Sequence, residues 1–289
     1  MRLPFRGAAV VGRGDDVART GAGRYLIYSV TKAYLAVLVL RVGLPLDEPF
    51  EGPWTLRQLL RNTAGVPNYS RLQEYEASVT ARPGEAWSDD EFLERALALP
   101  RPFAPGEGWE YSNTGFLLVR RAVEQAVGLE RALRDHVAEP LGLRETRWAL
   151  EVSDLDGLEP GEARGLGGDV QGVYDPKWVG HRVLVSTPDE VFRFWSALLA
   201  GELVSLDVLL DAVPADDADG FGRPAYGLGV IVDREWPGGG TLVGHGGGGP
   251  GYCAGVFGRL DGTLAVVLSN EDGADAQGEA LRLLAAAPT

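Results

Sequence analysis

The sequence has 289 residues, a length that suits one large domain or two lobes sharing a core. Its 27 basic and 41 acidic side chains give a formal net charge of −14, which disfavours nucleic acids and anionic membrane surfaces as partners. The single cysteine, Cys253, excludes an internal disulfide. Three histidines and one cysteine leave too few ligands for a zinc site, and no motif calls for a cofactor, so we expect neither a metal nor another cofactor.

The sequence also indicates where the protein works. Its longest apolar run, residues 33–40, has eight residues, far fewer than the ~20 that cross a bilayer. Residues 1–6 are charged but lead into Gly7 and Arg13 rather than into the apolar stretch of a signal peptide. We therefore expect a cytoplasmic protein that acts on a small molecule, with its oligomeric state left open.

In chain order the pattern predicts strands, then helices, then strands again. Short strands at 7–11, 17–20 and 25–28 precede an apolar helix over 29–41. Helices are predicted at 55–62, 89–99, 114–127, 131–137 and 188–200, with Gly- and Pro-rich breakers between them. Strands at 226–232, 241–243, 252–257 and 263–268 and a closing helix at 275–286 follow. This order predicts an α+β fold, in which an antiparallel sheet from both chain ends (1–45 and 219–289) carries a mainly helical insertion (46–218).

Ser29 and Lys32 are spaced to lie on one face of the first helix, at its start. Burial and the positive helix end both disfavour an ammonium there, so a neutral Lys32 would take the Ser29 proton and create a nucleophile. Lys32 is one of only two lysines beside 25 arginines, and arginine cannot lose its proton. From these residues alone the alternative stays open that Ser29 merely caps a core helix while Lys32 extends to solvent.

Two further segments offer polar groups for a site. Tyr111 and Asn113 precede the helix at 114–127, where Asn113 is either a helix cap or an amide that holds a substrate carbonyl, with Tyr111 as a proton relay. The run from Gly244 to Gly251 fits G-x-G-x-x-G, but Pro250 leads into a strand instead of a dinucleotide-binding helix. No serine lies in G-x-S-x-G. The glycines are therefore either a tight turn or an edge-strand oxyanion site.

Taken together, Ser29-x-x-Lys32, Tyr111-x-Asn113 and His245-x-Gly247 resemble the serine β-lactamase and penicillin-binding protein superfamily. The class C branch, which includes DD-peptidases, D-amino-acid peptidases and β-lactamase-like esterases, is the closer match. Further segments also resemble that branch: 46–49, 55–60, 105–107, 139–143, 186–189 and 268–270. The resemblance spans nearly the whole chain and implies a β-lactamase/transpeptidase-like fold with its active site between the sheet lobe and the helical lobe.

The resemblance assigns chemical roles to three residues. It makes Ser29 the acylated nucleophile, Lys32 its base and Tyr111 a proton shuttle. The resemblance also implies four substrate-binding residues: Asn113, His245, Gly247 and Gly248. Asn113 would bind the substrate amide, and His245 would face the substrate from the strand. The backbone N–H groups of Ser29 and Gly248 would form the oxyanion hole.

One departure from the family pattern bears on the substrate. β-Lactamases of this branch carry a lysine in the third motif that grips the substrate carboxylate, whereas this chain has His245, expected to be partly charged near pH 7. We therefore expect a serine hydrolase that cleaves a small ester or amide through an acyl-enzyme. The alternatives are a DD-peptidase or weak β-lactamase, an acyl transferase, and a non-catalytic ligand-binding homologue.

Several residues stay unassigned by the sequence. His181 either lines a pocket or is structural. Four further residues are candidates for shaping the pocket that holds the acyl group: Tyr174, Asp175, Trp178 and Trp236. Cys253, in a predicted strand, is expected to be a small buried side chain.

Overall fold

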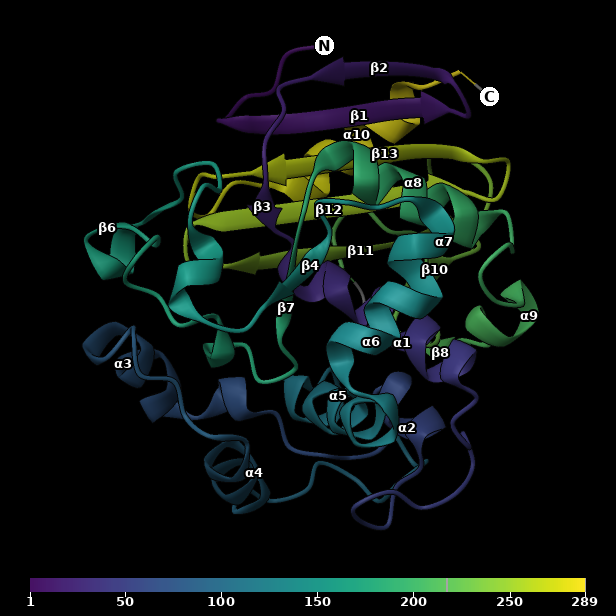
Figure 1. The fold of residues 1–289 in the computed structure, drawn as a ribbon. Coiled ribbons are helices and arrows are strands. Elements are labelled where there is room, and N and C mark those ends of the chain that lie inside the picture. The colour runs from purple at the N-terminus through teal and green to yellow at the C-terminus, as the bar shows by residue number, and fades with distance from the viewer. Residues whose placement is uncertain (217, 289) are drawn as a thin grey trace.

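The computed structural model describes residues 1–216 and 218–288. Within these ranges, eight strands form one antiparallel sheet in which the N-terminal hairpin lies directly beside the C-terminal strands (Figure 1). Their order across the sheet is β2 (Asp16–Thr20), β1 (Gly7–Arg13), β13 (Thr263–Ser269), β12 (Tyr252–Arg259), β11 (Leu242–Gly249), β10 (Ile231–Asp233), β9 (Pro224–Tyr226) and β8 (Val213–Pro214). The predicted α+β fold, with a sheet from both chain ends around a helical insertion, is confirmed.

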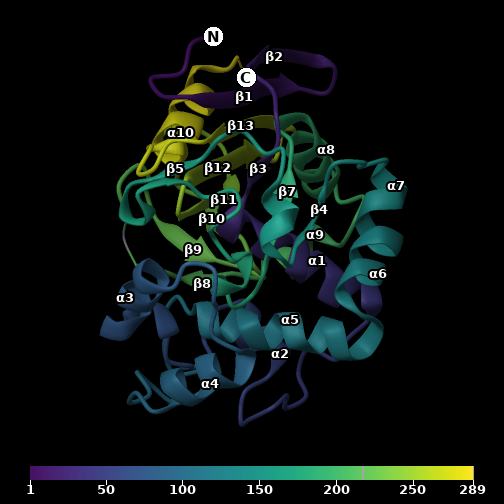
Figure 2. The same cartoon turned by 60° about the vertical axis from the view of Figure 1, so that its left-hand side comes forward.

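Both faces of this sheet are buried, and β13 shows how its residues divide between them. Leu264 and Val266 enter the main core, whereas the alternating Ala265 and Val267 enter a second core on the opposite face. The main core includes helices α1 (Thr31–Val42) and α8 (Pro188–Leu199), and the second is closed by α10 (Ala276–Ala286). Figure 2 shows the sheet between α10 and α8.

The helical part surrounds α1. Residues 31–39 of α1 are all buried, which confirms a helix covered on every side, and α5 (Asn113–Val127) packs against it. The other helices of the described residues are α2 (Leu56–Leu60), α3 (Gln73–Ala81), α4 (Asp89–Leu97), α6 (Leu129–Leu133), α7 (Glu139–Leu141) and α9 (Leu206–Leu209). Two small sheets complete the fold: β3 (Tyr25–Leu26), β7 (Val183–Ser186) and β4 (Arg147–Ala149), and β5 (Glu162–Ala163) with β6 (Gly168–Asp169).

Among the elements that differ from the sequence-based prediction, three have a clear physical reason. The strand predicted at 226–232 is divided into β9 and β10 by a turn in which Gly229 approaches α1 so closely that a Cβ would stand 2.6 Å from the carbonyl oxygen of Lys32. β3 pairs with β7 instead of joining the main sheet. Helix α3 has no predicted counterpart, since Val79 is its single buried residue and the apolar pattern is correspondingly weak.

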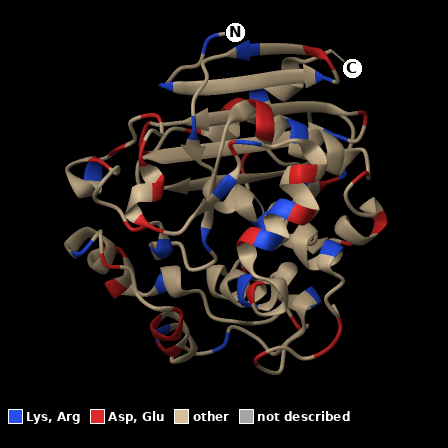
Figure 3. Ribbon diagram, viewed as in Figure 1, with Lys and Arg blue, Asp and Glu red and all other residues tan. Residues whose placement is uncertain are grey.

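Charged side chains of both signs are spread over helices and loops, whereas β11 to β13 are almost free of charge (Figure 3). Arg120 of α5 is a charged residue that is buried instead of lying at the surface. Its side chain is 1% exposed and pairs with Asp89 and Glu124. Asp89 also binds Arg182 at 3.0 Å, so this buried network ties α4 and α5 to the segment before β7. None of the helices formed by the described residues combines the length and the apolar character needed to span a bilayer.

Candidate active site

Ser29 lies in a short 3-10 turn, Tyr28–Val30, that leads directly into α1. Tyr28 adopts a φ of +42°, in the left-handed region that costs a bulky side chain energy, and its hydroxyl donates to the carbonyl of Pro250 at 2.6 Å. Among the described residues, no side-chain hydrogen bond caps either this turn or α1. The helix-cap alternative for Ser29 is therefore wrong, and its hydroxyl is left for other contacts.

Lys32 is fully buried one turn further along, and its amine reaches back to Ser29. The distance from Lys32 Nζ is 2.9 Å to Ser29 Oγ, 2.9 Å to Asn113 Oδ1 and 3.2 Å to His181 Nε2. Burial lowers the pKa of the Lys32 amine well below its usual value. Lys32 does not extend to solvent, because its exposed fraction is 0%. A deprotonated amine at this place has its lone pair within hydrogen-bonding reach of the Ser29 hydroxyl.

Tyr111 and Asn113 reach the same point from the loop before α5. The Tyr111 hydroxyl donates to Ser29 Oγ at 3.0 Å, and burial raises the pKa of this phenol, which keeps it protonated. Ser112 is the N-cap of α5, since its hydroxyl accepts from the amide of Gly115 at 3.1 Å. Because Ser112 takes that role, the cap alternative for Asn113 is wrong, and the side-chain amide of Asn113 is free to bind Lys32.

The glycine run forms most of β11 and lies against the Ser29 turn. β10 pairs only with residues 242–244, so from His245 onward the edge of β11 that faces away from β12 is next to the turn instead of a strand. A Cβ on Gly247 would stand 2.8 Å from the carbonyl oxygen of Ile27 and 2.9 Å from the amide nitrogen of Ser29. Only bare backbone fits this approach, which favours the edge-strand interpretation over a tight turn.

His245 is on this strand, but its charge differs from the prediction. Nδ1 donates to the carbonyl of Gly246, and Nε2 lies 2.8 Å from the Tyr226 hydroxyl, which therefore donates to it. Burial lowers the pKa of His245 to about 3. The expected partial charge near pH 7 is wrong, because the imidazole is out of water and both nitrogens bind neutral groups.

Two hollows adjoin the site, and Gly248 lines both. The first, about 370 Å³, includes Ser29, Tyr111, His245 and Gly247 and is completed by residues of α10 and its N-cap, Asp275, Ala276 and Gln277. The second, about 410 Å³, contains Asn113 and is walled by Ser70, Tyr75, Glu76, Val79, Leu166, Tyr174, Pro250 and Asp272. Among their described lining residues there is no lysine or arginine.

The other pocket candidates divide between the site and the core. Tyr174 lines the second hollow, but Trp178 belongs to a buried aromatic cluster with Tyr75 and Trp87. Trp236 lies in the second core on the far face of the sheet, so its assignment to an acyl pocket is wrong. Cys253 is only partly buried and lines the first hollow, contrary to the expected buried strand residue.

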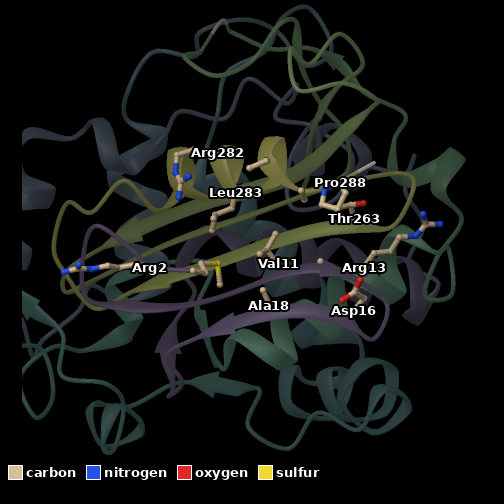
Figure 4. A pocket seen from close by; sticks show the side chains of 13 residues that line it. Arg2, Val11, Arg13, Asp16, Ala18, Thr263, Arg282, Leu283 and Pro288 are labelled. Carbon is tan, nitrogen blue, oxygen red and sulfur yellow. The ribbon is translucent and has the colours of Figure 1, made fainter.

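A further cavity of about 580 Å³ lies away from these residues, between the β1–β2 hairpin and the end of α10 (Figure 4). Its lining includes Val11, Ala18 and Leu283 and none of the predicted site residues. Arg2 and Arg13 extend from it in opposite directions, so their guanidinium groups do not converge on a common ligand position (Figure 4).

Sequence reasoning did not find Tyr226 or the Lys32 contact of His181. Both side chains are at most 2% exposed and meet the site through the tertiary fold, His181 from 149 positions along the chain. Asn68 was missed as well: its side chain donates to the Tyr111 carbonyl and accepts from the Asn113 amide, both at 3.2 Å. The sequence signal that could have pointed to Asn68 was its place directly after the Gly65-Val66-Pro67 breaker, where a polar side chain lies in a loop.

Comparison with known proteins identifies relatives of this chain. Penicillin-binding protein 4* of Bacillus subtilis is 27% identical over 241 residues, covering 78% of this chain and 52% of that protein. A D-aminopeptidase of Cereibacter sphaeroides is 30% identical over 253 residues, covering 82% of this chain and 46% of that protein. The chain thus spans about half the length of these curated relatives.

The fold is shared with solved structures. A D-stereospecific amidohydrolase from Streptomyces sp. superposes with a TM-score of 0.85 at 24% identity, covering 96% of this chain and 93% of that one. The family model described as Beta-lactamase matches residues 5–287. With that match over almost its full length, the chain belongs to the Beta-lactamase family.

Proposed function

We propose that the protein is a serine hydrolase that cleaves a small ester or amide through an acyl-enzyme on Ser29. The observation that carries this proposal is the cluster at Ser29 Oγ, with Lys32 Nζ at 2.9 Å and the Tyr111 hydroxyl at 3.0 Å. Nucleophilic catalysis by serine needs a neighbouring base and an oriented proton donor, and both lie within hydrogen-bonding reach.

In the first half-reaction the Ser29 hydroxyl gives its proton to the neutral amine of Lys32 while Oγ bonds to the substrate carbonyl carbon. The carbonyl π electrons move to oxygen, and the oxyanion lies beside the amides of Ser29 and Gly248. Tyr111, held protonated by burial, then donates a proton to the leaving amine or alcohol as its bond to carbon breaks. The proton on the Lys32 ammonium then passes to the Tyr111 phenolate, which restores both groups. Water attacks the acyl-enzyme, and the acid is released with Ser29 regenerated.

The electrostatics of the two hollows favour a substrate without a carboxylate near the reacting bond. Their described lining residues include no arginine or lysine, His245 is neutral, and three carboxylates, Glu76, Asp272 and Asp275, lie along them. A β-lactam carboxylate would find no cationic partner there, whereas a neutral substrate or one with an amino group avoids that repulsion. The names D-aminopeptidase and D-stereospecific amidohydrolase among the relatives support an amide of this kind.

A substrate panel tests the proposal. Wild type and Ser29→Ala are compared on p-nitrophenyl esters, on D- and L-amino-acid amides and on a penicillin, with acyl-enzyme formation followed by mass spectrometry. We expect turnover of an ester or amide by the wild type alone, and mass addition on Ser29. A label on another residue, or equal rates for both proteins, would refute the assignment, and turnover of the penicillin would favour the β-lactamase alternative.

A further inference from the structure

His181 meets Lys32 on the side away from the substrate hollows. Its Nε2 lies 3.2 Å from Lys32 Nζ, its side chain is 1% exposed, and its ring packs edge-on against Phe116 with centroids 6.4 Å apart. It lines neither hollow beside Ser29. A histidine at this place therefore contacts the base of the proposed reaction and not the substrate.

The valence of a neutral amine explains what this contact does. A deprotonated Lys32 has two N–H donors and one lone pair, and the lone pair must face the Ser29 hydroxyl for proton transfer. The two N–H groups then need two acceptors, and Asn113 Oδ1 at 2.9 Å supplies one. The rings of Tyr111 and Phe116, 5.0 and 5.2 Å away, offer no comparable lone pair. The second acceptor within reach is Nε2 of His181.

The chemistry of imidazole suits this role better than a carboxylate would. A carboxylate beside Lys32 would favour the ammonium, whereas a neutral imidazole accepts an N–H without a formal charge. Burial, together with the positive charges of Arg120 and Arg182, lowers the pKa of His181 well below its usual value and keeps it neutral. An accepting Nε2 requires the proton on Nδ1, and Nδ1 is buried with no protein hydrogen-bond partner within the described residues. That unpaired polar atom opposes stability and so calls for a functional reason.

The backbone around His181 is fixed on both sides. The amide of Gly180 donates to the Tyr69 hydroxyl at 3.0 Å, and its carbonyl accepts from Arg120 at 3.3 Å. Arg182 follows with a φ of +64°, a strained value for a residue with a side chain, and is held by Asp89 at 3.0 Å. These contacts fix the backbone that carries the imidazole.

We propose that His181 is a positioning residue for the base, in which Nε2 accepts one N–H of the Lys32 amine and so turns the lone pair of that amine towards Ser29. The inference rests on the proposed function and adds a member to its machinery. It makes His181 necessary for acylation of Ser29 but not for substrate binding.

A matched pair of substitutions tests this role. His181→Gln places an amide oxygen near the position of Nε2, whereas His181→Leu fills similar space without an acceptor. Rates of Ser29 labelling by a fluorophosphonate and KM and kcat for a p-nitrophenyl ester are measured for both variants, with Tm as the folding control. We expect His181→Leu to acylate about 10–100-fold more slowly with KM little changed, and His181→Gln to recover most of that loss.

The outcomes separate this role from the proposed function. Normal labelling of the wild type with an equal rate in His181→Leu, or equal losses in both variants, would overturn the role of His181 alone. No labelling of wild-type Ser29 would overturn the proposed function and this inference with it. Nitrogen NMR of the wild-type protein, which needs no variant to fold, should show His181 protonated on Nδ1 and not on Nε2, and the opposite tautomer would also overturn the proposal.

Discussion

The close backbone approach between β11 and the Ser29 turn gives a prediction that can be worked out from distances. Replacing Gly247 by alanine places a Cβ 2.8 Å from the carbonyl oxygen of Ile27 and 2.9 Å from the amide nitrogen of Ser29. Both neighbours are backbone atoms, so no side chain can move away to relieve the overlap. β11 and the turn must therefore separate by several tenths of an ångström.

That separation has two measurable effects. Overpacking of this kind costs about 1–3 kcal/mol in the free energy of unfolding. In a chain of this size class each kcal/mol lowers Tm by about 2–4 °C. Moving β11 also displaces the Gly248 amide from the proposed oxyanion position, and loss of one such donor lowers kcat by about 10²–10³-fold. We expect Gly247→Ala to show both effects together.

Gly248→Ala is the matched comparison, because the nearest atom to its Cβ would be Cys253 Sγ at an ordinary 3.8 Å. This variant keeps its amide and should lose less than about 0.5 kcal/mol in stability, with a far smaller fall in ester hydrolysis than Gly247→Ala. The assays are thermal unfolding and acylation of Ser29. Wild-type Tm and acylation rate in Gly247→Ala, or equal losses in both variants, would refute this account of the interface.

Three further predictions concern the base, the buried histidine and the helix cap. Lys32→Arg should abolish turnover of a p-nitrophenyl ester while circular dichroism stays unchanged, because a guanidinium cannot accept the Ser29 proton; unchanged rates would remove Lys32 from the mechanism. Unfolded His245 gains its proton near pH 6.5 but the folded form only at about 3, so the free energy of unfolding should fall as pH drops through that window. In urea titrations from pH 7 to 4, His245→Asn should show a shallower fall by up to about 1.4 kcal/mol per pH unit, and identical slopes would contradict the buried neutral state. Ser112→Ala should lower stability by about 0.5–2 kcal/mol in the same assay, and an unchanged midpoint would rule out the cap.

The sequence was informative where chemistry depends on local spacing. Ser29 and Lys32 are three residues apart at a helix start, and Tyr111 and Asn113 flank a helix entrance, so each pair is placed by its own segment. The sheet from both chain ends was likewise predictable from alternating apolar runs with turn residues between them. These features need only neighbours in the sequence.

The rest depends on contacts between distant segments. His181 reaches Lys32 across 149 positions, and Tyr226 binds Nε2 of His245 from another strand, so sequence spacing predicts neither contact. The charge of His245 was wrong because burial, which sets its pKa, is not visible in a strand pattern. Gly229 breaks its strand for a reason that lies in α1, against which it packs.

The pairing of β1 with β13 has a consequence for how the protein matures. Gly7 lies opposite Ser269, so β1 waits for a strand 262 positions further along the chain before its ladder is complete. Until then the N-terminal hairpin exposes an unpaired edge, the kind of surface that invites aggregation and slow, non-local folding. Under the proposed mechanism, a nascent chain that has not yet reached β11 would carry Ser29 and Lys32 without the strand that lies against them, so it would not turn over substrate until β11 has joined the sheet.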